Sequence, residues 1–231
     1  MFESRSLKPE RIDTGDYTPE EYERFLSDIR LINRLAGDRR ALRLSLLREI
    51  EKENLRRFSV LDVGAGSGEL LRVIAGFARR QNRRATLCGL ELNARSAEAI
   101  LEESSEMDEI NSIRGDALEL PFADDSFDYA ICSLFTHHLT DDEIVRVFGE
   151  MGRVAARRIF VIDLHRHPFA YALYQMFCAG FRISPLVRQD GSLSILKSFR
   201  PPELESLGRR ANFETVSVKR RFPFRLVLRG G

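Results

Sequence analysis

The sequence lacks the features that would place the chain outside the cell or within a membrane. It has three cysteines, Cys88, Cys132 and Cys178, which lie far apart and show no CxxC spacing. An odd number of separated thiols argues against a disulfide framework and favours a reducing compartment. The first residues lack the apolar core of a signal peptide. The longest strongly apolar stretch, residues 168–181, is shorter than the ~20 residues of a spanning helix. We therefore expect a cytoplasmic protein without stable membrane insertion.

The chain also lacks an excess of charge of either sign, with 36 Lys and Arg against 35 Asp and Glu. Such a chain has no overall field that would attract nucleic acid, so we expect no nucleic-acid partner. The charge is uneven locally, because residues 200–231 contain eight basic and three acidic side chains. This segment is either a solvated face or a basic edge that meets an anionic partner, and the sequence leaves both open.

Segments with the period of strands alternate with segments with the period of helices along the 231 residues. This alternation is typical of an α/β fold with a mainly parallel sheet and helices on both faces. The length suits a single domain with a cap, which we place at residues 1–56 (N-terminal helical cap segment) and 57–231 (main domain, with an insert at about 166–199). Strands are predicted at 58–64, 85–92, within 111–120, and at 127–135, 157–165, 214–222 and 224–230, the last two pairing through a turn at Pro223. Helices are predicted at 22–35, 41–53, 69–81, 94–107, 140–155 and 201–213, with Thr140 as an N-cap.

The most informative stretch is the glycine-rich turn after the first predicted strand, "VLDVGAGSGEL" at residues 60–70. In a doubly wound sheet, this first strand-to-helix turn is the usual nucleotide site. Its glycines are spaced G-x-G-x-G, and Glu69 stands where the third glycine of a dinucleotide fingerprint would fall. Asp62 would repel a pyrophosphate but could pair with a cationic amino-acid group. The turn therefore disfavours an NAD-dependent oxidoreductase.

Two further carboxylates follow the next two predicted strands. Glu91 ends the second strand, roughly 20 residues past the glycines, where an acid accepts hydrogen bonds from ribose hydroxyls. Asp116 follows the third strand, where a carboxylate beside backbone N–H and C=O groups can read an adenine edge. Acids at three successive strand ends favour a nucleoside ligand.

The stretches "VLDVGAGSGEL", "LCGLEL", "GDALELPF" and "FDYAICSLFTHHL" resemble the four successive binding motifs of class I S-adenosylmethionine-dependent methyltransferases. The resemblance covers roughly residues 58–164, with order and spacing intact. It implies a Rossmann-like, doubly wound, seven-stranded sheet with an antiparallel last strand, S-adenosylmethionine as cofactor and S-adenosylhomocysteine as product. Glu91 departs slightly from the pattern, in which Asp is also common. The implied cofactor-binding residues are Asp62, Gly64, Ala65, Gly66, Gly68, Glu91, Leu92, Asp116, Ala117 and Ser133.

All four histidines follow the fourth and fifth predicted strands, on the side where the resemblance places the methyl acceptor. Histidine is the side chain best suited to proton transfer near neutral pH. We predict His138 as a catalytic base, with His165 as the second candidate and Asp163 orienting either. Alternatively, His138 caps the next helix, and a carbon acceptor on an activated ring needs no base. A metal site of Asp163, His165 and His167 lacks a separate partner motif, so we expect no metal.

The segment after the fifth strand is unusually aromatic for a connection. It either fills a core, forms a lid over an apolar substrate together with the N-terminal helix, or touches a membrane surface transiently. The predicted substrate-binding residues are Phe25, Ile29, His137, Tyr171, Tyr174 and Phe177.

The leading hypothesis is an enzyme that methylates a small, largely apolar, aromatic or polyketide-like acceptor, with oxygen preferred over carbon. The wider chain resembles bacterial methyltransferases of phenolic, quinone or polyketide-like molecules, which implies a role in secondary metabolism. The alternatives are an RNA or protein methyltransferase and a non-catalytic nucleoside-binding or assembly protein. The chain is expected to be a monomer or a homodimer.

Overall fold

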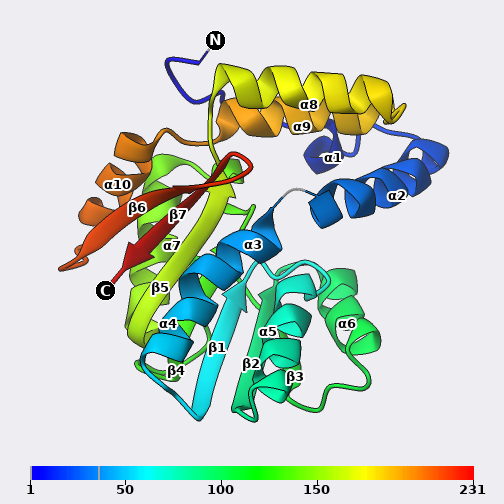
Figure 1. Ribbon diagram of the computed structural model, residues 1–231. Helices are drawn as coiled ribbons and strands as arrows, with labels where there is room; N and C mark the ends of the chain where they lie inside the picture. The colour runs from blue at the N-terminus through cyan, green and yellow to red at the C-terminus, as the bar shows by residue number, and fades with distance from the viewer. Residues whose placement is uncertain (1, 36) are drawn as a thin grey trace.

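The computed structural model describes residues 2–35 and 37–231, and its centre is a seven-stranded sheet with the order β3-β2-β1-β4-β5-β7-β6 (Figure 1). The strands are β1 (Arg57–Val63), β2 (Arg84–Glu91), β3 (Ile110–Arg114), β4 (Phe127–Ser133), β5 (Ala155–Leu164), β6 (Val216–Arg221) and β7 (Arg225–Gly230). Neighbours pair in parallel except at β7, which runs antiparallel to both β5 and β6. The predicted mostly parallel sheet with an antiparallel last strand is confirmed.

Helices cover both faces of the sheet, as the alternating pattern predicts. One face carries α3 (Asp38–Leu42), a π-helical turn (Arg43–Leu47), α4 (Arg48–Lys52), α5 (Glu69–Arg80) and α6 (Ala94–Glu103). The other carries α7 (Asp141–Val154) and α10 (Pro201–Arg210). Each group of helices forms a separate apolar core with the alternating side chains of the strands, and this rigid frame holds the strand ends in place.

In the part of the chain that the structure describes, further helices lie beyond the carboxyl ends of the parallel strands (Figure 1). They are α1 (Arg11–Thr14), α2 (Pro19–Leu35), α8 (Pro168–Gly180) and α9 (Pro185–Lys197). Within the described residues, the structure contains no helix long and apolar enough to cross a membrane. The predicted cap segment of residues 1–56 divides in the structure, because α3 and α4 pack on the sheet while α2 contacts α9.

The N-terminus of α3 is held to the sheet by a buried ion pair. Arg225 on β7 donates from Nε to Oδ1 of Asp38 at 2.5 Å and from a terminal nitrogen to Oδ2 at 3.1 Å. Gly37, which precedes Asp38, has a φ of +91° and contacts the turn at Pro223. The start of α3 is thereby fixed against the β6–β7 hairpin.

Helix α7 begins with the predicted cap. The Thr140 hydroxyl accepts from the N–H of Glu143, and the Glu143 carboxylate accepts from the N–H of Thr140 at 2.8 Å. This reciprocal pair satisfies two N–H groups that the helix leaves without partners.

Replacing Thr140 with alanine removes one half of this capping box. We expect the free energy of unfolding to fall by about 1 kcal/mol. Urea titration of both proteins measures the difference, and Thr140→Ser serves as the control that keeps the hydroxyl. An alanine variant as stable as the wild type would contradict a stabilising role for the cap.

Candidate active site

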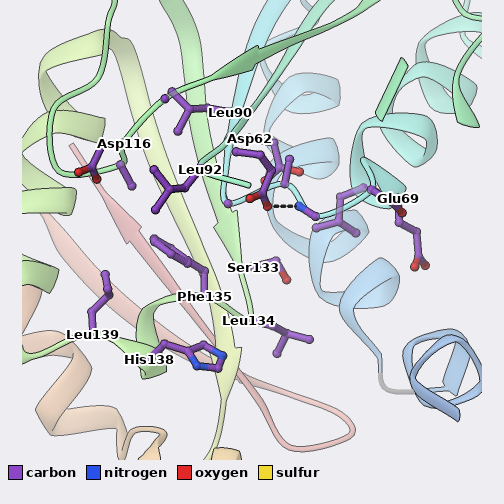
Figure 2. Close-up of a pocket in the computed structure, with 18 of the residues that line it drawn as sticks. Asp62, Glu69, Leu90, Leu92, Asp116, Ser133, Leu134, Phe135, His138 and Leu139 are labelled. Carbon is purple, nitrogen blue, oxygen red and sulfur yellow. Dashed lines mark hydrogen bonds between the residues drawn. The ribbon is translucent and has the colours of Figure 1, made fainter. Parts of the chain in front are cut away.

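A cavity of about 710 Å³ opens at the carboxyl ends of β1, β2, β3 and β4 (Figure 2). It is lined by residues from the glycine-rich turn and by the ends of three other strands, at 90–92, 115–118 and 133–135, with His138 and Leu139 beyond. This is the edge of the sheet at which doubly wound folds bind their ligands. In Figure 2, Asp62 and Asp116 lie in the upper part of the view, and His138 lies below them.

The glycine-rich turn connects β1 to α5 and has the backbone conformation that its glycines permit. Gly64, Gly66 and Gly68 all have positive φ angles, and the N–H of Gly64 donates to the carbonyl of Leu90. A Cβ at Gly64 would lie 2.9 Å from the ring of Phe135, so a larger residue cannot fit there. Gly68 caps α5 and does not line the cavity, unlike Gly64, Ala65 and Gly66. The turn thus presents backbone and the start of a helix to the cavity.

Asp62 is the most unusual group in the cavity wall. Its side chain is almost fully buried, and Oδ1 has no hydrogen-bond partner among the described residues. Burial, reinforced by the nearby charge of Glu91, raises the pKa of Asp62 to about 8. A buried carboxyl that lacks a partner is costly, and a cation bound in the cavity would remove that cost.

Glu91 lies at the end of β2, beside the glycine-rich turn. Its Oε1 accepts a hydrogen bond of 2.5 Å from the N–H of Gly66, drawn as a dashed line in Figure 2. Burial raises its pKa, while hydrogen bonds from the N–H groups of Gly66, Leu92 and Asn93 partly counter that effect. Glu91 therefore couples the turn to the second strand at the cavity wall.

Asp116, Ala117 and Leu92 line the cavity on the side away from α5. The Asp116 carboxylate accepts from the N–H of Leu118 at 2.9 Å, which fixes the turn after β3. Leu92 is 65% exposed and extends over the cavity between Asp116 and Phe135 in Figure 2. An apolar side chain beside a carboxylate suits a planar, polar-edged ligand.

His138 is the histidine that lines the cavity. It ends a short 3₁₀ turn, Thr136–His138, and its Nδ1 lies 3.4 Å from Nζ of Lys197, at the end of α9. Oε1 of Glu10 lies 3.3 Å from the same Nζ and 3.8 Å from Nδ1. The N-terminal segment and α9 therefore hold a buried ion pair against His138.

His137 is turned away from the cavity and is held by Asp163. Its Nδ1 lies 2.7 Å from Oδ1 of Asp163, and Oδ2 accepts from the Thr136 hydroxyl and from the N–H of His137. Burial alone would raise the pKa of Asp163, but the charge and hydrogen bond of His137, with bonds from Thr136 and Leu164, hold it at about 2. Asp163 thus orients His137, whereas the sequence suggested His138 or His165.

His165 does not reach the cavity. It lies in an isolated bridge with Phe199, and its ring is 5.2 Å from that of His167. Burial, then the neighbouring His167 and Arg220, lower its pKa to about 4. His167 caps α8 by accepting from the N–H of Phe169. His165 and His167 therefore lie in the connection from β5 to the insert, where they have structural contacts.

The aromatic insert forms the α8–α9 hairpin. Among the residues predicted to bind substrate, Tyr174, Phe177 and Phe25 pack around Cys178 and Val187 in a small core of their own. The Tyr174 hydroxyl donates to the carbonyl of Val187, and Tyr171 packs edge-on against Phe2 at 5.9 Å. Ile29, on α2, is half-buried. None of these side chains lines the cavity, and Tyr174, Phe177 and Phe25 fill the space between the cap helices instead.

Sequence reasoning missed part of the cavity lining. Leu134, Phe135 and Leu139 flank the predicted histidines in "LFTHHL", so the same motif contained the signal for them. Asp38 lies at the start of α3, and nothing in its local sequence connects it with the glycine-rich turn. Glu10 and Lys197 are far from every motif, and only the folded chain brings them beside His138.

Comparison with known proteins agrees with this geometry. Residues 60–158 match a family model described as a methyltransferase domain. The chain is 29% identical over 170 residues to the 2-phytyl-1,4-naphtoquinone methyltransferase of Thermosynechococcus vestitus, an alignment that covers 68% of this chain and 73% of that protein.

Solved structures share the fold at low sequence identity. The magnesium protoporphyrin IX methyltransferase of Synechocystis PCC 6803 with bound S-adenosylhomocysteine superposes with a TM-score of 0.62 and 15% identity, over 91% of this chain and 94% of that one. A putative O-methyltransferase of Nostoc punctiforme has a TM-score of 0.56 and 19% identity, over 75% of this chain, which spans about half of that protein (51%).

The fold is that of solved S-adenosylmethionine-dependent methyltransferases. Residues 60–158 match the model of a methyltransferase domain, and the Synechocystis neighbour binds S-adenosylhomocysteine, the product that S-adenosylmethionine leaves after methyl transfer. The cavity fits this cofactor in charge, because the partnerless carboxyl of Asp62 can receive the ammonium group of its methionine part.

Proposed function

We propose that this protein transfers the methyl group of S-adenosylmethionine to a small, largely apolar, aromatic or polyketide-like acceptor, with oxygen as the preferred methylated atom. The observation that carries the proposal is the cavity itself, in which three acids at strand ends share one space with His138, Phe135 and Leu139. The acids suit a cationic nucleoside, and the histidine with its apolar neighbours suits an acceptor that must lose a proton.

On the donor side, we assign each cavity residue the contact that its chemistry favours. Asp62 pairs with the ammonium group, and the glycine-rich turn accommodates the methionine part. Glu91 accepts from the ribose hydroxyls, and Asp116, with Leu92 and Ala117, holds the adenine. The bound cofactor supplies a methyl group on a cationic sulfur, which an electron-rich atom can attack directly.

On the acceptor side, the protein has to align the acceptor with the methyl group and to accept a proton from it. Holding the acceptor in line with the methyl group accounts for much of the acceleration in such reactions. His138 takes the proton of a phenolic or enolic hydroxyl as the new O–C bond forms. Phe135 and Leu139 exclude water around the reacting atoms and favour an apolar acceptor.

The name of the Thermosynechococcus relative specifies a naphthoquinone as its methyl acceptor, which supports an aromatic acceptor here. Quinones and polyketide-derived phenols share planar rings with ionisable or carbonyl oxygens. The sequence of the basic segment at residues 200–231 suggests an anionic partner such as RNA, but the structure pairs several of its arginines with acids. Arg225 pairs with Asp38, Arg229 with Glu49 and Arg210 with Asp142. Much of the segment's charge is therefore neutralised within the fold.

The first test is calorimetry with S-adenosylhomocysteine and the intact protein. Because Asp62 is largely protonated when the cavity is free and ionised when it meets the ammonium, we expect binding near pH 7 to release a proton. The affinity should rise with pH up to about 8, and the observed binding enthalpy should change with the ionisation enthalpy of the buffer.

Absence of binding would overturn the assigned cofactor contacts. Binding without proton release would contradict the role given to Asp62 and would leave the other cofactor contacts standing. Turnover is then measured with labelled S-adenosylmethionine and a panel of phenols, hydroquinones and cyclic 1,3-diketones, and transfer only to RNA or protein would refute the small-molecule acceptor.

A further inference from the structure

Helix α8 presents an apolar surface to solvent along much of its length. Residues 168–180 include no charged side chain. Phe169, Leu173 and Met176 are 69%, 52% and 69% exposed, and their spacing of four and three places them on one side of the helix. The opposite side packs on α9 through Tyr174 and Cys178. A helix that is apolar on both sides normally has a partner on each of them.

The exposed surface continues from α8 to the turn between β6 and β7. The ring of His167 stacks at 5.5 Å on Phe169 and at 5.8 Å on Phe224 in that turn. Phe222, two residues earlier, is 72% exposed. In Figure 1, α8 lies along the upper edge of the molecule, with this turn below its N-terminal end. We call Phe169, Leu173 and Met176 the apolar face.

Exposed arginines lie on the α8–α9 hairpin beside the apolar face, although the neighbouring Glu3 and the α2 residues Glu20 and Glu23 are exposed acids. Between residues 166 and 200 the exposed charged side chains are Arg182, Arg188 and Arg200, while the acid of this segment, Asp190, is buried. Arg188 donates to the side chain of Gln175 on α8, so it lies beside the helix. Lys219 and Arg220 are exposed on β6, and residues 216–226 contain no acid.

We propose that the apolar face and its basic margin dock the protein on the surface of an anionic lipid bilayer. Apolar side chains enter the headgroup region of a bilayer, and arginines at the margin attract anionic headgroups. A second copy of the chain is the alternative occupant, and the sedimentation experiment below tests it. Docking of this kind is peripheral and does not depend on which acceptor is methylated.

The position of the face connects docking with the cavity. Helix α8 packs on α9, and Lys197 at the end of α9 contacts His138 in the cavity wall. A bilayer on α8 would therefore lie on the far side of the cap from His138. This connection rests on the proposed function: an apolar acceptor dissolved in the bilayer would have a short route to the cap.

The test is co-sedimentation of the full chain with phosphatidylcholine vesicles, with and without phosphatidylglycerol. We expect binding to the anionic vesicles that weakens as salt is added. Met176→Glu and Leu173→Glu should each lower the partition coefficient at least tenfold. The double variant Arg182→Ala/Arg188→Ala should lower it by about five-fold for each arginine. Leu101→Glu on α6, where the leucine is 50% exposed, is the matched control and should bind like the wild type.

Thermal melting and S-adenosylhomocysteine binding are measured for every variant, so that a loss of docking is not confused with unfolding or with failure of the cofactor site. Three results would overturn the proposal. They are absence of vesicle binding by the wild type, equal binding to neutral and anionic vesicles, and a dimer in sedimentation that Met176→Glu dissociates.

Discussion

Replacing Asp62 with asparagine will weaken the binding of S-adenosylhomocysteine by about a hundredfold to several thousandfold and will stabilise the ligand-free protein at neutral pH. The loss of affinity follows because removing one member of a buried charge pair costs about 3–5 kcal/mol. The ammonium group of the ligand would enter the cavity and find an amide in place of a carboxylate. The gain in stability has a separate origin, in the raised pKa of Asp62.

Folding moves the pKa of Asp62 from 3.8 to about 8, so the folded state favours the protonated carboxyl. The unfolded state releases this proton at a lower pH, so the free energy of unfolding falls as pH rises from about 4 to about 8. Asparagine has no such proton. The stability of the variant relative to the wild type should therefore increase by about 2–3 kcal/mol between about pH 5 and about pH 7.

Urea titrations of both proteins at several pH values, together with calorimetry, check the two halves of this prediction. Asp116→Asn is the control for removing a carboxyl from the cavity, since the Asp116 carboxylate is exposed and accepts from the N–H of Leu118. A stability difference between Asp62→Asn and the wild type that stays constant with pH would show that Asp62 is ionised in the free protein.

Replacing His138 with alanine will lower kcat by about 100-fold to 10,000-fold on a phenolic acceptor, the range typical of a positioned base. Affinity for S-adenosylhomocysteine should change less than twofold, because the cofactor contacts are assigned to other residues. His165→Ala is the control that separates the two histidines predicted from the sequence, and it should keep kcat close to that of the wild type. Its imidazole lies outside the cavity, and burial lowers its pKa to about 4.

Initial rates with labelled S-adenosylmethionine at saturating acceptor give both comparisons. Full activity of His138→Ala would remove the base and favour transfer to carbon or to an acceptor that is already ionised, without changing the enzyme class. A large loss in His165→Ala with an unchanged melting temperature would return the catalytic role to that histidine.

The parts of the site that the sequence predicts are those encoded locally. Local structure is specified within a few residues at the glycines with positive φ, at the acids that end strands, and at Thr140 before an acidic turn. The structure places three of these acids, Asp62, Glu91 and Asp116, around one cavity. The order of the strands follows because alternating strands and helices allow few topologies.

The parts that the sequence does not predict depend on pairing between distant residues. Lys197 meets Glu10 and His138 because α9 crosses the N-terminal segment, and no local pattern encodes that crossing. The role of the aromatic insert cannot be predicted from the sequence for a related reason. Apolar side chains on both sides of α8 fit a core, a lid or a docking face equally well until the position of α9 distinguishes the two sides.

The N-terminal segment is tied to the cavity rim by contacts that span most of the chain. Arg5 donates to the carbonyls of Lys197 and Leu139, 192 and 134 residues away, and its guanidinium stacks over the ring of Phe199. Closing loops of this length costs entropy that only late, cooperative contacts repay. During synthesis, the glycine-rich turn and the first four strands have all emerged before Lys197 exists. We therefore expect the donor half of the cavity to form first and its histidine rim to be completed only after α9 has been synthesised.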